Sequence, residues 1–384
     1  MDPKLFFDPV SDEIPFDNYK KNSIYNSISV NRGRLPELEG VDMAIVGLKD
    51  NRSGGESRKA EEGPTRIREK FYHLKKWSGL YRIVDLGNLR NGPELDDTYL
   101  RLKEVCEHLL EKNILPLIIG GGHDFDFAQY CAYESMDKLV TLINIDSKFD
   151  LEDSDNGRES HIHKIIAHEP NFLFNYSHIA HQSYLVDEKE NQLLENLSFD
   201  TFRLGVVKEN LKEMEPIIRD GDLLSFDLSA IKSSYFPGTS ERTVYGLTGE
   251  EACQICWYGG LNDKLSSIGF YEYDPGYDTE DFQSAFVVST MMWYFIEGFY
   301  HRKQESIFRS NDYLIYEVAT GMEPETIRFY KSKLSEKWWM EVPHLSEGRN
   351  IRRNRIIPCS YSDYETTCKG ELPERWIAMQ TKII

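Results

Sequence analysis

The chain has 384 residues, of which 40% are hydrophobic and 28% are charged, a balance typical of one large α/β domain or of one domain with an appendage. Its formal net charge of −19 argues against nucleic acids and acidic membrane surfaces as partners. No apolar run reaches the roughly 20 residues that span a bilayer, the N-terminus lacks the layout of a signal peptide, and the six cysteines are scattered. We therefore expect a cytoplasmic protein.

Short apolar runs alternate with amphipathic runs from about residue 41 to residue 300. Apolar runs of this kind are typical of strands that are covered on both faces. We predict strands at 43–48, 81–86, 115–119, 140–145, 178–181, 202–207, 223–226 and 267–271. We predict helices from about residue 64, and at 96–112, 250–258 and 281–299. The alternation predicts a three-layer α-β-α fold with a mostly parallel sheet of about eight strands.

The two ends of the chain lack this alternation. Residues 1–40 are predicted to be an N-terminal segment that wraps the α/β domain of residues 41–300. Residues 301–384 contain Trp338, Trp339 and Trp376, and are aromatic enough to pack. We predict that they form a C-terminal extension packed on the domain, with a separate binding module as the alternative.

Acidic and imidazole side chains follow four of the predicted strands. His123 follows a glycine triplet after the third strand, and Asp146 and Asp150 follow the fourth. Asp227 follows the seventh strand and Glu272 follows the eighth. Because parallel strands end at the same edge of a sheet, we expect these side chains to lie close together. Carboxylates crowded in this way repel one another, so a cation is expected among them.

Three short motifs carry a resemblance to a known family. They are G-G-G-H-D at 120–124, D-S-K-F-D at 146–150, and S-F-D-L-S at 225–229 followed by P-G-T at 237–239. Over about residues 41–300 the chain resembles the arginase, agmatinase and formimidoylglutamase (ureohydrolase) family, and is most similar to formimidoylglutamase. The resemblance implies an arginase-like fold that hydrolyses a carbon–nitrogen bond of a linear amidine or guanidino compound.

The resemblance also implies a metal centre in which six residues hold two manganese ions. The protein ligands of the first ion are matched by His123, Asp146, Asp150 and Asp227. The second ion would need a histidine and an aspartate that are replaced here by Lys148 and Ser229. A protonated lysine has no lone pair, and serine is a poor ligand beside a carboxylate, so we expect the second position to be empty. The prediction is one divalent ion, Mn²⁺, and the alternatives are no metal or two metals.

Lys148 and Glu272 are the candidate catalytic residues. Three aspartates remain at the metal-ligand positions, and one divalent ion with the Lys148 ammonium would balance their charge. We hypothesise that this ammonium replaces the second ion and lies near Asp227. Glu272 stands in a segment that resembles the one whose glutamate holds the cationic nitrogen of the substrate in the family. The alternative is a buried acid paired with Lys148 or with an arginine.

Two other patterns are interpreted as structural. His161 and His163 lie near the start of a predicted helix and point to different faces, so we expect no joint metal site and predict a surface role for them. The C-x-x-C of residues 253–256 lies inside a helical run without a second pair for zinc, and we interpret both cysteines as core residues.

Two functions remain open from the sequence. One is a hydrolase with a reduced, single-metal centre that acts on a small cationic amidine or guanidino substrate. The other is a catalytically lapsed arginase-fold protein that acts as a binding or scaffold protein, because a fold does not by itself imply an activity. The resemblance further implies a homo-oligomer whose subunit number the sequence does not fix.

Overall fold

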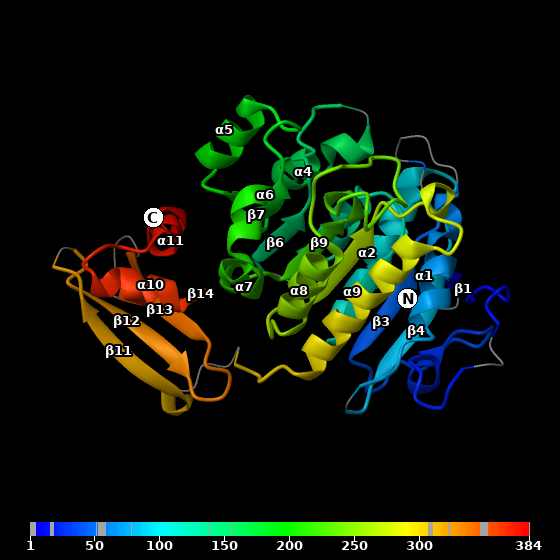
Figure 1. Cartoon of the computed structure of the whole chain (residues 1–384), viewed down its shortest axis with the longest axis horizontal. Coiled ribbons are helices and arrows are strands. Elements are labelled where there is room, and N and C mark those ends of the chain that lie inside the picture. The colour runs from blue at the N-terminus through cyan, green and yellow to red at the C-terminus, as the bar shows by residue number, and fades with distance from the viewer. Residues whose placement is uncertain are drawn as a thin grey trace.

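The computed structural model describes residues 5–15, 19–50, 52, 59–77, 79–136, 138–154, 156–305, 310–321, 323–345 and 352–383. A large sheet lies between two layers of helices, and a smaller sheet built from C-terminal residues lies beside this domain (Figure 1). None of the helices in the described ranges is long and apolar enough to cross a membrane.

The large sheet has ten strands in the described part of the chain, in the order β1-β4-β3-β5-β10-β9-β6-β7-β8, with β2 beside β4. Their bounds are β1 Phe7–Asp8, β2 Ser29–Val30, β3 Met43–Gly47, β4 Ile83–Leu89, β5 Leu115–Ile119, β6 Val140–Ile145, β7 Leu173–His181, β8 Asp200–Arg203, β9 Leu223–Asp227 and β10 Ser267–Tyr271. All pairings are parallel except that of β1 with β4. The predicted three-layer fold is confirmed, with the two-residue strands β1 and β2 added to eight longer ones.

Helices cover both faces of this sheet (Figure 1). Their bounds are α1 Gly63–Phe71, α2 Leu95–Glu111, α3 Phe125–Cys131, α4 Gly157–Ala167, α5 Glu188–Asn196, α6 Leu204–Glu209, α7 Met214–Arg219, α8 Gly249–Gly260 and α9 Gln283–Tyr300. Local sequence fixes several starts: α8 begins with a capping box in which Thr248 and Glu251 each satisfy the backbone N–H of the other. Every residue of β3, β5, β6, β9 and β10 is buried, which explains their continuous apolarity.

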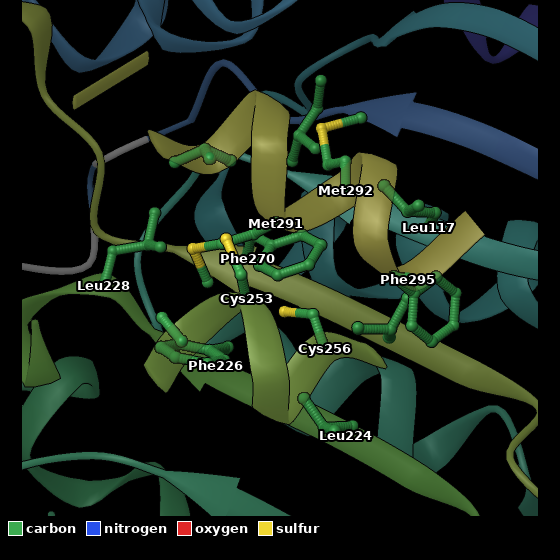
Figure 2. Packing of buried hydrophobic residues seen from close by; sticks show 14 of the residues in the cluster. Leu117, Leu224, Phe226, Leu228, Cys253, Cys256, Phe270, Met291, Met292 and Phe295 are labelled. Atoms are coloured by element: carbon green, nitrogen blue, oxygen red, sulfur yellow. The ribbon is translucent and has the colours of Figure 1, made fainter. Parts of the chain in front are cut away.

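Figure 2 shows how α8 and α9 pack on the central strands. Cys253 and Cys256 of α8 and Met291 of α9 meet Phe226 and Phe270 in one apolar cluster. Both cysteines are buried, and burial raises the pKa of the Cys253 thiol to about 11. The C-x-x-C is therefore part of the core, as predicted.

One predicted strand is partly wrong. The run at 202–207 was expected to be a strand, but β8 ends at Arg203 and the chain continues as helix α6. Val207 is buried against the core while Val206 is exposed, an arrangement that a helix at the edge of the sheet satisfies. A short apolar run has no periodicity that separates a strand from a helix, so the sequence could not locate this boundary.

The C-terminal residues form a second, antiparallel sheet in the order β11-β12-β13-β14, followed by two helices. The bounds are β11 Tyr313–Ala319, β12 Thr326–Ser332, β13 Trp338–Leu345, β14 Arg352–Cys359, α10 Tyr361–Cys368 and α11 Glu374–Ile383. This part has its own apolar cluster, which includes Phe329, Met340 and Trp376.

Arg219, the last residue of α7, joins this second sheet to the large domain. Its Nη2 donates to the backbone carbonyls of Trp338 at 3.0 Å and of Cys359 at 3.2 Å, and its guanidinium lies 4.3 Å from the centre of the Trp339 ring. Lys382 of α11 adds an ion pair with Asp200 of β8 at 2.7 Å. The extension therefore contacts the edge of the domain formed by α7 and β8.

A buried ion pair holds α1 against β4, and we expect its loss to be costly. The Arg68 guanidinium donates to Asp85 at 2.8 and 2.9 Å, and both side chains are almost fully buried. Arg68→Ala should lower the free energy of unfolding by about 3–5 kcal/mol, because the Asp85 carboxylate would stay buried without its counter-ion. Urea denaturation measures the change.

The control for this prediction is Arg90→Ala, because Arg90 pairs with Asp8 on the surface at 2.7 Å. Such an exposed pair contributes about 1 kcal/mol or less. Equal losses of stability in the two variants would show that burial of the Arg68 pair does not matter.

Candidate metal centre

The four predicted metal ligands stand at the carboxyl ends of neighbouring strands. His123 lies in the turn between β5 and α3, Asp146 and Asp150 follow β6, and Asp227 ends β9. Strand β10 lies between β5 and β9, and β9 pairs with β6, so these ends are adjacent at one edge of the sheet. The predicted convergence of the motifs at this edge is what the structure shows.

The glycine triplet before His123 has a steric reason. Gly120 and Gly121 have φ angles of +82° and +80°, in the left-handed region that glycine adopts without strain. A Cβ atom on Gly120 would lie 2.8 Å from the carbonyl oxygen of Leu48. Only glycine lets the chain turn this closely from β5 and bring His123 over the sheet edge.

One ligand atom from each of the four residues can be chosen so that all four atoms lie within 4.8 Å of one another. His123 Nδ1 lies 3.3 Å from Asp227 Oδ2, 3.4 Å from Asp146 Oδ2 and 3.8 Å from Asp150 Oδ2. His123 Nδ1 and Asp146 Oδ2 are buried and have no hydrogen-bond partner among the residues that the structure describes. Because buried polar atoms are normally satisfied, this arrangement fits a cation placed between them, and three carboxylates with one imidazole suit Mn²⁺.

The pKa shifts in the cluster also indicate that it favours a bound cation. Burial raises the pKa of Asp146, and the charges of Asp227 and Asp150 raise it further. Burial lowers the pKa of His123, but Asp146, Asp150 and Asp227 outweigh burial and raise it well above the usual range. The acids thus bind a positive charge in their midst, and a metal ion would take the place of the imidazole proton.

A chain of hydrogen bonds that runs from His123 to Asp150 supports the cluster. His123 Nε2 and the Ser225 hydroxyl are 2.9 Å apart, and this hydroxyl donates to Asp126 Oδ2 at 2.9 Å. Asp126 Oδ1 lies 2.7 Å from His161 Nδ1, and His161 Nε2 lies 3.2 Å from Asp150 Oδ2. This chain of contacts fixes the orientation of both His123 and Asp150, as outer partners of metal ligands commonly do.

The predicted surface role of His161 is wrong. His161 is completely buried, whereas 41% of the His163 side chain is exposed. Two residues apart on α4, the histidines do point to different faces, but the face of His161 covers the cluster. Burial opposes a charge on His161, yet Asp126 raises its pKa to about 9. Asp126 was not singled out in the sequence, although it stands three residues after His123 at the start of α3.

We expect Asp126→Asn to lower the affinity of the chain for Mn²⁺ by about 10- to 100-fold, because the variant weakens the support of His123 and His161. Calorimetric titration of the metal-free chain with Mn²⁺ measures the affinity. The matched control is Asp124→Asn, because Asp124 is beside the same histidine but accepts its hydrogen bond from Tyr99. Unchanged affinity in the Asp126 variant would remove this residue from the centre.

Lys148 pairs with Glu241, where we had expected its ammonium near Asp227. Glu241 raises the pKa of Lys148 against the opposing effect of burial, so the ammonium is held in its charged form. Glu241 adds a further carboxylate beside this ammonium, so the predicted balance of three aspartates against one ion and one lysine is not met. The sequence offered no signal for Glu241, which lies in a long loop after the P-G-T turn.

Ser229 stands two residues after Asp227, the last residue of β9. Its backbone N–H donates to Asp227 Oδ1 at 2.6 Å, and its side chain is buried. Lys148, Ser229 and Glu241 line the same pocket as the four predicted ligands. The altered pair of residues therefore faces the centre, and neither contributes a carboxylate or an imidazole to it.

Glu272 follows β10 and points to the same pocket. Its Oε1 accepts a hydrogen bond from the backbone N–H of His123 at 2.8 Å and lies 3.1 Å from Arg158 Nε. Burial raises the pKa of Glu272 to about 7, with Arg158 opposing and Asp227 adding to the rise. In the structure Glu272 is a buried acid paired with an arginine, Arg158. Arg158 was not singled out in the sequence.

Two residues of the site have unusual backbone angles. Asp150 has φ +51° and Glu272 has φ +68°, both in the left-handed region. Residues other than glycine adopt this region at a cost of about 1–3 kcal/mol. Strain of this kind persists where the surrounding structure holds a side chain in place, and here it aims two carboxylates at one pocket.

A model of the arginase family matches residues 41–297 of the chain. A curated formimidoylglutamase of Staphylococcus haemolyticus (strain JCSC1435) is 27% identical over 246 residues, which are 61% of this chain and 78% of that protein. A formimidoylglutamase of Staphylococcus aureus (strain MRSA252) is 26% identical over 249 residues, which are 62% and 79% of the two chains.

Solved structures are similar in fold. The crystal structure of Trypanosoma cruzi formiminoglutamase with Mn²⁺ has a TM-score of 0.64 and 22% identity, and covers 69% of this chain and 96% of that one. The formimidoylglutamase from Bacillus subtilis has a TM-score of 0.67 and 15% identity, and covers 75% and 95%. The family match ends before β11, so the second sheet lies outside it.

Proposed function

Because the chain belongs to the arginase family, we propose that it is a metal-dependent hydrolase that cleaves a carbon–nitrogen bond of a linear amidine, with a single Mn²⁺ held by four residues. The proposed ligands are His123, Asp146, Asp150 and Asp227. The observation that carries the proposal is the buried, unpartnered pair of His123 Nδ1 and Asp146 Oδ2 inside this cluster. The similarity to proteins named formimidoylglutamase supports the substrate class.

The roles of the side chains follow from their positions. When bound, the ion would lower the pKa of a water molecule and so supply the nucleophile at neutral pH. Glu272 would hold the amidinium of the substrate, because a carboxylate is the natural partner of a planar cation. The Lys148 ammonium at the rim would stabilise negative charge that develops during the attack. His161 and Asp126 would keep Asp150 and His123 in position.

A second candidate function is a catalytically lapsed binding or scaffold protein. One observation favours it: Lys148 and Ser229 stand where a second ion would need ligands. One ion also lowers the pKa of a water less than two ions do.

The experiment that separates the two functions is a substrate screen with the full chain. Formimino and guanidino compounds are incubated with the Mn²⁺-loaded protein, and release of formamide, ammonia or urea is measured. The hydrolase predicts release that depends on Mn²⁺ and disappears in Asp146→Asn. A chain that binds Mn²⁺ but releases nothing above buffer from any compound is the lapsed protein.

A further inference from the structure

The Arg158 guanidinium reaches into the site from the second residue of α4. Its side chain is 11% exposed and that of Glu272 is 9% exposed, and Arg158 Nε lies 3.1 Å from Glu272 Oε1. Both residues line the pocket of the metal centre and also the neighbouring pocket formed with Gly121, Ser240 and Asp274. Arg158 and Glu272 therefore stand at the boundary between two small spaces.

Arg158 contacts Glu272 with the same kind of group that a bound amidine substrate would offer. A guanidinium and an amidinium are both flat cations that offer N–H groups to a carboxylate. A buried carboxylate that is already paired with one cation has little attraction for a second, because the first cancels its charge and repels the newcomer. A cationic amidine can thus reach Glu272 only after the Arg158 guanidinium has left.

The geometry of the pair is that of a replaceable contact. Arg158 Nε is buried, but within the described part of the chain it makes no directed hydrogen bond. The pair Arg68–Asp85 shows the contrast, because there Nε and Nη2 each donate to a carboxylate oxygen in the fork geometry of a strong pair. The Arg158 backbone is attached at the start of α4, where its N–H donates to Asn156 Oδ1 at 3.3 Å.

We propose that Arg158 is a built-in guanidinium that occupies the place of the substrate's amidinium on Glu272 and so controls which ligands the site admits. The proposal rests on the proposed function, because it takes Glu272 as the group that holds the substrate. In the wild-type chain Arg158 occupies the position beside the Glu272 carboxylate, and a simple cationic amidine binds weakly. Removing the Arg158 guanidinium leaves the Glu272 carboxylate accessible to a free amidinium of the same shape and charge.

The test is calorimetric titration of the full, metal-free chain with formamidinium chloride, with sodium chloride as the ionic-strength control. Arg158→Ala should bind formamidinium at least about tenfold more tightly than the wild type, because an uncompensated buried carboxylate regains a charged hydrogen-bond partner. Arg158→Lys keeps a cation at the position and should bind as weakly as the wild type. The double variant Arg158→Ala/Glu272→Gln should lose the gain.

Three outcomes would overturn the proposal. They are a wild type that binds formamidinium as tightly as Arg158→Ala, a folded Arg158→Ala that does not bind it, and a double variant that retains the gain. Circular dichroism shows whether each variant is folded, and Arg158→Gln replaces the alanine variant if that one is not. Because the titration needs no metal and no turnover, a chain that passes this test but hydrolyses nothing refutes the proposed function alone.

Discussion

Lys148→His combined with Ser229→Asp should raise the Mn²⁺ content of the purified chain from one ion to two. The two substitutions place an imidazole and a carboxylate in the pocket that Asp146 and Asp227 already line. They also remove the ammonium that pairs with Glu241, so a positive charge no longer opposes a second cation. Elemental analysis after exhaustive dialysis gives the number of ions per chain.

The control for the double variant is Lys148→Gln combined with Ser229→Ala. It removes the ammonium without adding a strong ligand, and its Mn²⁺ content should remain at one ion per chain. Two ions in the wild type would show that Lys148 and Ser229 do not prevent the second site. One ion in the Lys148→His/Ser229→Asp variant would show that the backbone, and not the two side chains, decides the number.

Asp146→Asn should lower the affinity for Mn²⁺ by more than about 100-fold and abolish the metal-dependent hydrolysis. Loss of an outer partner of a metal ligand already lowers the affinity about 10- to 100-fold. Asp146 is itself one of the four clustered ligand candidates. Asparagine keeps the size of the side chain but replaces a charged oxygen by a neutral amide. Calorimetric titration with Mn²⁺ gives the affinity, and product release gives the activity.

Asp153→Asn is the control for this substitution, because the Asp153 side chain is almost fully exposed and lies outside the cluster. Its affinity for Mn²⁺ should equal that of the wild type. If Asp146→Asn retains full affinity, the ion is held elsewhere and the assignment of the centre fails.

The sheet and the ligand cluster were predictable from the sequence because both depend on local patterns. The predicted strands 115–119, 140–145 and 267–271 coincide with β5, β6 and β10, since each is a short, wholly buried run that ends at a glycine or polar residue. Once the strands were placed, the parallel topology was enough to bring His123, Asp146 and Asp227 to one edge.

The partners of the site residues were not predictable in the same way. Arg158 and His161 come from α4 and Glu241 from a long loop, and the path of these segments depends on tertiary packing. Lys148 could be recognised as an unusual residue, but nothing in the sequence said that Glu241, and not Asp227, would take its charge. The sequence leaves Lys148 or an arginine as the alternative partner of Glu272, and the structure identifies the partner as Arg158.

The contacts of Arg219 have a practical consequence for anyone who prepares this protein. A shortened gene product that stops where the family match ends would lack the carbonyls of Trp338 and Cys359. The Arg219 guanidinium would then lose both acceptors. Arg219 lies four residues before β9, the strand that ends at Asp227. Metal content and turnover should therefore be measured on the full chain.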